Sequence, residues 1–270
     1  MLKDITIGQY FPGDSPVHRL DPRMKIILTL VFVVIIFVPD NPVGLLVGGL
    51  FAAAGYLIAR IPIKMVRKSI KPVIPIIVFT GILNMFFVGG DPVFQLWVFK
   101  ITYEGVMLAV LMTVRIVCLI AGTSLLTYTT SPIALTDGIE QLLGPLKRLR
   151  LPVHELAMMM TIALRFIPTL IEETDKIMSA QKARGADLES GGLMQRAKAL
   201  IPILIPLFVS SFRRADELAL AMECRCYRGG EGRTRMKQLK YCPRDFAALA
   251  IGFACLGLVI GLNLIFPSVY

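Results

Sequence analysis

The 270-residue sequence is poor in charge: only 18% of its residues are Asp, Glu, Lys or Arg, whereas 55% are hydrophobic. Soluble chains usually carry about 25% charged and about 45–50% apolar residues, and the mean hydropathy of +0.69 lies on the apolar side. This balance excludes an intrinsically disordered chain and a small disulfide-stabilised secreted domain. Because the apolar stretches are continuous rather than alternating, they favour membrane-spanning helices over a membrane β-barrel.

The sequence also lacks the motifs that accompany common catalytic and cofactor sites. It contains no GxxxxGK[ST] loop, no HExxH or GxSxG motif, and only two histidines. Cys224 and Cys226 have no second cysteine pair and no nearby histidine that would complete a zinc site. We therefore expect no catalytic residue, no cofactor-binding residue and no metal site, and we do not expect this chain to hydrolyse ATP itself.

Several long apolar stretches are present instead. Five of them are candidates for membrane spans: Ile26–Val38, Pro42–Ala59, Val73–Val88, Gly105–Leu126 and Phe246–Phe266. The first is short compared with the roughly 20 residues that a helix needs to cross the hydrocarbon core, so it requires flanking residues or tilt. The sequence thus predicts an all-α polytopic membrane protein with about five transmembrane helices.

The 29 lysines and arginines, against 19 acidic residues, are distributed unevenly along the chain. Four precede the first span, five lie between the second and third, and 18 lie between Lys147 and Arg244. Since cytoplasmic loops are enriched in Lys and Arg, we place the N-terminus, the second loop and residues 127–244 in the cytoplasm. The positive charge is thereby explained without nucleic acid. Contact with membrane lipids is open for the basic clusters of the long segment, although solvated loop charges are the simpler interpretation.

Residues 127–244 combine this charge with helical periodicity. We predict one long helix from about Pro152 to Arg184 and a second from about Leu193 to Arg225, each ended by glycines. Prolines 168, 202 and 206 are expected to bend these helices. The predicted organisation is a membrane part with four transmembrane helices at 1–130, a cytoplasmic helical region at 131–243 and a C-terminal transmembrane helix at 244–270.

The two long helices end in similar sequences. Residues 175–184 and 216–225 are offset by 41 positions and share an Asp, an Ala and a terminal Arg, with a helix break after each Arg. A single Arg at a helix C-terminus is ordinarily explained by its favourable interaction with the helix dipole. Two matched ends in one cytoplasmic segment favour a different interpretation, namely two equivalent binding sites on a two-fold or pseudo-two-fold partner.

These motifs resemble a known family, the transmembrane T component (EcfT) of energy-coupling factor (ECF) transporters, over essentially the whole chain. Residues 8–25, which include Asp21, Pro22 and Arg23, look like the opening signature of that family. A simpler interpretation of the three residues is helix initiation by Asp and Pro next to a positive-inside anchor, and we favour it.

Two further stretches complete the resemblance. Ala183-Arg184-Gly185 is similar to the first of the two Ala-Arg-Gly motifs of the family. Cys224-Arg225-Cys226 stands where the second is expected, but it keeps only the Arg.

The resemblance implies the transmembrane subunit of an ABC-type importer in the cell membrane. Its expected partners are two cytosolic ATPase subunits, the same or different, and a membrane-embedded S component that binds a vitamin or a metal ion. In this family the long coupling helices seat their arginine-bearing ends in grooves of the ATPases and pass their closure on to the S component. The resemblance makes vitamin uptake the default, with cobalt or nickel import as the variant, and makes both Arg motifs ATPase-coupling sites.

Two other classes of function stay open at this stage. A self-contained secondary transporter would show inverted repeats and several ionisable groups inside its spans, whereas the spans contain one, Arg115. We expect Arg115 to face a protein interior or a partner, since a charge is costly in lipid. A membrane enzyme would need a carboxylate or histidine constellation, and only Glu172, Glu173 and Asp175 come near, with the spacing of an exposed helix face.

Overall fold

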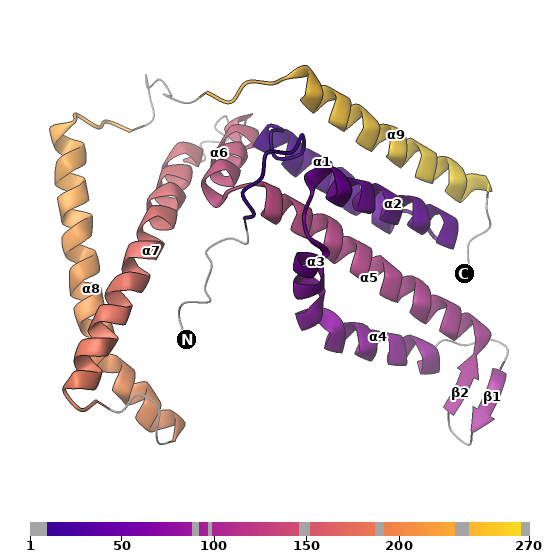
Figure 1. Cartoon of the computed structure of the whole chain (residues 1–270), viewed down its shortest axis with the longest axis horizontal. Coiled ribbons are helices and arrows are strands. Elements are labelled where there is room, and N and C mark those ends of the chain that lie inside the picture. Colours follow the sequence, from indigo (N-terminus) through magenta and orange to yellow (C-terminus); the bar gives the residue numbers. More distant parts are fainter. Residues whose placement is uncertain are drawn as a thin grey trace. The chain divides into compact units, whose positions relative to one another are not determined.

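The computed structural model describes residues 10–87, 92–96, 99–145, 152–186, 192–229 and 238–265, and it is largely helical (Figure 1). Within these residues the helices are α1 (Pro22–Phe37), α2 (Pro42–Ala59), α3 (Ile63–Ile70), α4 (Ile74–Phe87), α5 (Tyr103–Thr129), α6 (Pro132–Leu142), α7 (Val153–Ala183), α8 (Leu193–Cys224) and α9 (Pro243–Ile265). A 3₁₀ turn, Lys71–Val73, precedes α4. The predicted all-α class of a polytopic membrane protein is confirmed.

One short β-hairpin interrupts the helices and was not predicted from the sequence. Strand β1 (Pro92–Leu96) pairs antiparallel with β2 (Phe99–Thr102) between α4 and α5. The side chain of Thr102 then caps α5 by accepting a hydrogen bond from the amide of Gly105 over 3.3 Å. The two strands together contain nine residues and leave the fold class unchanged.

The described residues form two compact units. The first, which we call the membrane unit, lies within Gly8–Gln141 and Gln238–Tyr270 and contains α1–α5, most of α6, and α9. The second, which we call the two-helix unit, lies within Leu142–Lys237 and contains α7 and α8. A Cβ on Gly138 of α6 would meet the Cβ of Pro22 at 3.1 Å, so α6 packs closely on the start of α1.

Four of the described helices are long and apolar enough to cross a membrane: α2, α5, α7 and α9. Three of them, α2, α5 and α9, coincide with predicted spans. The first and third predicted spans correspond to α1 and α4, which have only 16 and 14 residues and therefore need flanking residues or a locally thinner bilayer to cross. The fourth candidate, α7, belongs to the segment that the charge distribution places in the cytoplasm.

The core of the membrane unit is formed where α1, α2 and α5 meet. Phe32, Ile36, Leu45 and Leu111 are buried together there. The close approach depends on Gly122 of α5, since a Cβ at this position would lie 1.9 Å from the ring of Phe32. A glycine without a side chain thus lets α5 approach the aromatic ring on α1.

Arg115 of α5 is buried in the membrane unit, with an exposed fraction of 8%. Its guanidinium donates a short hydrogen bond to the backbone carbonyl of Pro39, in the loop between α1 and α2. The expectation that Arg115 faces a protein interior is confirmed. The group that receives its hydrogen bond is a backbone carbonyl rather than an acidic side chain.

Candidate functional site: two matched helix ends

Helix α7 ends in a pair of capping hydrogen bonds. Arg184 is its C-cap residue, and Gly185 follows with a φ of 84°, in the left-handed region. The amide of Ala186 donates to the carbonyl of Gln181 and the amide of Gly185 to that of Lys182, both over 3.0 Å. These two bonds form a Schellman motif, which satisfies carbonyls that the end of a helix leaves unpaired.

Helix α8 ends in the same way. Arg225 is its C-cap residue, and Cys226 follows with a φ of 54°. The amide of Tyr227 donates to the carbonyl of Met222 over 3.0 Å, and the amide of Cys226 to that of Glu223 over 2.8 Å. Every one of these residues stands 41 positions after its counterpart in α7. The similarity of the two ends thus extends from the sequence to the backbone hydrogen bonds.

The two ends differ in the residue that takes the left-handed conformation. Gly185 adopts it without steric cost, because it has no Cβ. Cys226 does have a Cβ, and an L-residue in this region is disfavoured by roughly 1 kcal/mol. The departure from Ala-Arg-Gly therefore leaves the geometry of the second end unchanged and makes it less stable.

The arginine side chains at both ends are exposed, as are Ala183 and Cys224 before them. In the described part of the chain, neither Arg184 nor Arg225 takes part in an ion pair or a side-chain hydrogen bond. A guanidinium is always charged and presents a planar set of donors that fits a carboxylate with two parallel hydrogen bonds. Both helix ends therefore offer an unused cationic group whose backbone is fixed by the capping bonds.

The two arginines lie at opposite ends of the α7–α8 pair. The side chain of Gln181 in α7 donates to the carbonyl of Pro202 in α8 over 3.2 Å, so the end of α7 lies beside the start of α8. Arg184 is within one turn of this contact. Arg225 lies 23 residues beyond Pro202, which corresponds to about 35 Å of helix. One small binding site cannot hold both guanidinium groups.

The prolines inside the two helices do not end them, and the predicted long helices at 152–184 and 193–225 are confirmed as α7 and α8. Pro206 has no amide hydrogen, so the carbonyl of Pro202, four residues earlier, lacks its usual helical donor. Gln181 supplies a donor to that carbonyl from α7. Pro206 therefore leaves the carbonyl of Pro202 free to accept the hydrogen bond that joins the two helices.

A second polar contact joins the helices between their ends. Glu173 of α7 accepts a hydrogen bond from the guanidinium of Arg214 of α8 over 2.8 Å, and also one from the hydroxyl of Ser210. The side chains of Arg214 and Glu173 are 36% and 20% exposed, so solvent weakens the ion pair. Together with the Gln181 contact, it fixes the register of α8 along α7.

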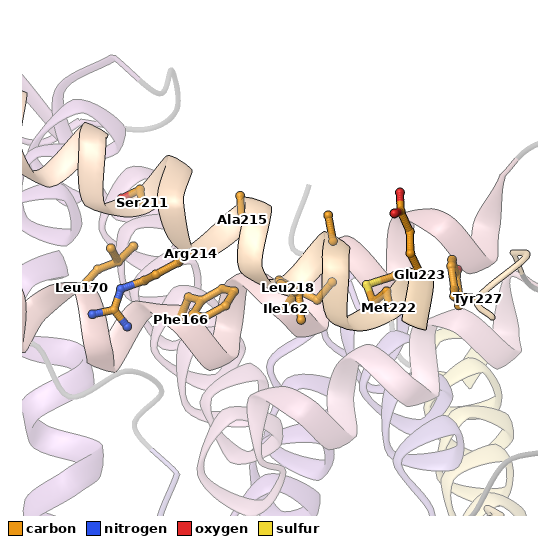
Figure 2. A pocket seen from close by; sticks show the side chains of 11 residues that line it. Ile162, Phe166, Leu170, Ser211, Arg214, Ala215, Leu218, Met222, Glu223 and Tyr227 are labelled. Atoms are coloured by element: carbon orange, nitrogen blue, oxygen red, sulfur yellow. The ribbon is translucent and has the colours of Figure 1, made fainter. Parts of the chain in front are cut away.

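A mainly apolar groove of about 500 Å³ lies between the first half of α7 and the second half of α8. Figure 2 shows Ile162 and Phe166 of α7 and Leu218 and Met222 of α8 pointing into it, whereas the carboxylate of Glu223 points away from α7. The groove extends to Tyr227, next to the Arg225 motif. The groove therefore separates part of the last turns of α8 from α7. These turns lie beyond the contact between Glu173 and Arg214.

The N-terminal signature residues form a buried junction in the membrane unit. Asp21 is the N-cap of α1, accepting from the amide of Arg23 over 2.9 Å, and Pro22 occupies the first turn. Helix initiation by Asp21 and Pro22 is thus confirmed. Arg23 is not a free anchor: it forms a 2.8 Å ion pair with Asp21, and its guanidinium carbon lies 3.8 Å from the ring centroid of Tyr241. Burial raises the pKa of the Asp21 carboxyl, but the hydrogen bonds from Arg23 outweigh it and hold the pKa below its usual value.

Two further charged residues, which the sequence analysis did not single out, belong to this junction. Asp245 of α9 is 1% exposed and accepts hydrogen bonds from the amides of Asp21 over 2.9 Å and Cys242 over 2.7 Å. The ammonium of Lys25 donates to the carbonyls of His18 over 3.0 Å and Thr129 over 2.8 Å. No local sequence signal relates residues 224 positions apart.

No cofactor site emerges in the part of the chain that the structure describes. Among those residues, no group of three or more His, Cys, Asp or Glu side chains could hold a metal ion. Cys224 and Cys226 are exposed, free thiols. Chemically, the matched helix ends can bind an acidic partner but offer no nucleophile–base pair.

The sequence of the chain matches a family of known proteins. Residues 13–236 match the model of the CbiQ family, described as cobalt transport protein. The energy-coupling factor transporter transmembrane protein EcfT of Clostridium kluyveri is 56% identical over 264 residues, covering 96% of this chain and 97% of that protein. EcfT of Ruminiclostridium cellulolyticum is 54% identical, covering 98% and 100%, and EcfT of Bacillus subtilis is 50% identical, covering 92% and 94%. The chain therefore belongs to the CbiQ–EcfT family of transmembrane components of energy-coupling factor transporters.

Proposed function

We propose that this chain couples ATP hydrolysis by two cytosolic ATPase subunits to the uptake of a micronutrient, by default a vitamin, that an S component binds. The observation that carries the proposal is the pair of matched helix ends. Each presents an arginine that is exposed and has no partner among the described residues. The sequence contains no GxxxxGK[ST] loop, and in this proposal ATP is hydrolysed by the partner subunits.

The structure of each helix end suits a role in docking. The capping bonds fix the backbone on both sides of Arg184 and of Arg225, so little backbone entropy remains to be lost when a partner binds. The guanidinium can then form two parallel, charge-assisted hydrogen bonds with a carboxylate on the partner. Each ATPase subunit is therefore expected to offer an acidic groove that receives one helix end.

The separation of the ends favours two partners over one. About 35 Å of helix lies between the turn that carries Arg184 and Arg225, and the contacts of Gln181 and Glu173 hold the helices in one register. A change in the distance between two ATPase subunits would therefore be transmitted to the helix pair as a rigid-body movement. Two different ATPase subunits would match the difference in sequence between the two helix ends. Two identical subunits would match the backbone geometry that the ends share.

The S component is expected to contact apolar side chains that α7 and α8 leave exposed. Met159 and Met160 of α7 and Leu204 and Phe208 of α8 have exposed fractions between 45% and 61%. Methionine side chains adapt their shape to different partners, which suits a surface that serves several S components. In this proposal α7 and α8 lie on the cytoplasmic side of the cell membrane together with the N-terminus.

The test reverses the charge at both helix ends in a complex co-expressed with its ATPase and S subunits. We expect Arg184→Glu/Arg225→Glu to lose the ATPase subunits on purification, or to retain them without transport, while the membrane unit remains folded. The matched control is Arg165→Glu/Arg213→Glu, which makes the same charge change at exposed positions in the middle of α7 and α8.

Two outcomes would contradict the proposal. Full transport by Arg184→Glu/Arg225→Glu would show that the matched ends do not couple. An equal loss of ATPase subunits in the Arg165/Arg213 control would show that net charge, rather than the helix ends, governs the assembly. Transport by the purified chain without any ATPase would instead favour a self-contained secondary transporter.

A further inference from the structure

Helix α3, together with its C-cap residue Lys71, carries four cations on a single face. Lys64, Arg67, Lys68 and Lys71 follow the spacing i, i+3, i+4, i+7, which places side chains along one side of a helix, and all four are exposed. No acidic residue occurs anywhere between Asp40 and Asp91, so these charges have no counter-ion within their part of the sequence. The face is therefore a concentrated positive patch without an internal partner nearby in the chain.

Other sides of α3 hold the helix to the membrane unit. The hydroxyl of Tyr128, at the end of α5, donates to the carbonyl of Met65 over 3.0 Å and forms a short hydrogen bond with the hydroxyl of Ser69. Tyr128 is 1% exposed and forms a buried cluster with Ala59 and Ile61. Met65 packs against this cluster. The orientation of the helix is thereby fixed, because Met65 and Ser69 face the protein while the cations face outward.

The position of α3 relates it to one end of the candidate spans. Helix α2 ends at Ala59, just before α3, and α5 ends at Thr129, next to the tyrosine that holds α3. Helix α1 begins beside the end of α5, since Lys25 in its first turn donates a hydrogen bond to the carbonyl of Thr129. Three of the apolar helices therefore begin or end beside α3, where a membrane would give way to water.

An exposed apolar side chain accompanies the cations. Ile63, at the first turn of α3, is 76% exposed. A short amphipathic helix with a basic face and apolar side chains is typical of segments that lie in the plane of the membrane surface. Phosphate groups of lipids at that surface would meet the positive patch.

We propose that α3 is a binding site for the headgroups of anionic phospholipids, contacted by Lys64, Arg67, Lys68 and Lys71. The observations that favour a lipid over an acidic protein surface are the location at the end of the spans and the exposed apolar side chain in the first turn. The site is independent of the coupling role of α7 and α8. Binding of anionic lipid there would hold this end of the membrane unit at the membrane surface.

The strength of the site follows from its charge. A cation near an anionic membrane surface contributes about 1 kcal/mol, which corresponds to roughly a fivefold change in lipid affinity for each cation removed. Salt should abolish the preference, since the Debye length falls from about 10 Å at 0.1 M to about 3 Å at 1 M.

The experiment uses the full chain in nanodiscs of phosphatidylcholine and phosphatidylglycerol, with either lipid brominated. Trp97 is the only tryptophan; it is replaced by Phe, and a reporter is introduced as Ile63→Trp. We expect stronger quenching by brominated phosphatidylglycerol than by the brominated neutral lipid. Lys64→Gln/Arg67→Gln/Lys68→Gln/Lys71→Gln should abolish the difference, and each single substitution should reduce the preference by up to about fivefold.

Two matched variants decide between charge and its position. The quadruple variant Lys64→Arg/Arg67→Lys/Lys68→Arg/Lys71→Arg keeps the charge and should keep the preference. A second quadruple variant, Lys176→Gln/Lys198→Gln/Arg213→Gln/Arg228→Gln, removes the same charge from exposed positions of the two-helix unit and should also keep it. If the first Gln variant does not fold, as judged by gel filtration, the single substitutions supply the measurement.

Three results would overturn the proposal. One is equal quenching by the two brominated lipids in the unmodified chain. Another is an equal loss of preference when the cations of the two-helix unit are removed. The third is an unchanged lipid preference in the α3 Gln variants. If these variants also lost a partner subunit from the assembled complex, the face would be assigned to an acidic protein surface.

Discussion

The end of α7 offers a direct test of how the arginines are held. In Gly185→Ala, a Cβ is added at a residue with a φ of 84°, and no described atom beyond residues 184–186 lies within 4 Å of the added carbon. Steric contact with other residues therefore contributes nothing, and only the backbone preference changes. We expect the capping bonds of Ala186 and of residue 185 to open more often, because an L-residue disfavours this conformation.

The magnitude can be estimated from that preference alone. A left-handed L-residue costs roughly 1 kcal/mol relative to glycine, which is about a fivefold increase in the open population of the helix end. The reverse substitution, Cys226→Gly, removes the same strain from α8 but increases the entropy of the unfolded segment by about 0.4–1 kcal/mol. The net gain is then between zero and about 0.6 kcal/mol, so we expect the protection at Tyr227 to increase by no more than about threefold.

Amide hydrogen exchange of the full chain in nanodiscs, followed by mass spectrometry, measures these openings. The protected amides are those of residues 185 and 186 in α7 and of 226 and 227 in α8. Gly192→Ala is the control, because Gly192 has a φ of −70° and open space around it. Unchanged exchange at residues 185 and 186 in Gly185→Ala would refute the account of the cap, and so would an equal change in the Gly192→Ala control.

The buried junction of the membrane unit gives two further predictions. Lys25→Met should lower the stability by about 1–3 kcal/mol, because the carbonyls of His18 and Thr129 lose the ammonium group that donates to them. Thermal unfolding in detergent measures this loss, and an unchanged midpoint would contradict the role given to Lys25. Asp245→Asn should lower the stability by about 1–3 kcal/mol, since the amide of Asp21 or that of Cys242 loses its acceptor. Asp216→Asn, at an exposed site, should leave the unfolding midpoint unchanged, and equal effects would refute this reasoning.

The long helices could be predicted because their signals are local. Apolar periodicity and the glycines after Arg184 and before Leu193 fixed the bounds of α7 and α8 to within a residue or so. The prolines were harder to interpret from the sequence. Their effect on helix continuity is local, but the use of the carbonyl of Pro202 by Gln181 depends on which helix packs beside it.

The buried junction could not be predicted for a related reason. Asp21, Pro22 and Arg23 were recognisable as a helix start, but the groups that complete the site come from Thr129 and Asp245, far along the chain. Arg115 is a similar case. Its guanidinium donates to the backbone carbonyl of Pro39, and since every residue possesses such a carbonyl, the sequence does not single out this acceptor.

The second Arg motif shows how a sequence motif and its structure can differ. Cys224-Arg225-Cys226 departs from the expected pattern at both flanking positions, yet its capping bonds repeat those of Ala183-Arg184-Gly185. The property that the two motifs share is the placement of an arginine at the C-cap, directly before a left-handed residue. Glycine satisfies this requirement at lower energy, and cysteine satisfies it with strain.

The N-terminal signature residues Pro22 and Arg23 also contact α6. A Cβ on Gly138 would lie 3.1 Å from the Cβ of Pro22 and 3.4 Å from the amide of Arg23, so α6 rests directly on the junction. The same start of α1 is tied to α5 through Lys25 and to α9 through Asp245. Helix initiation explains the Asp-Pro pair, whereas the burial of Arg23 goes with its ion pair to Asp21 and its contact with the ring of Tyr241.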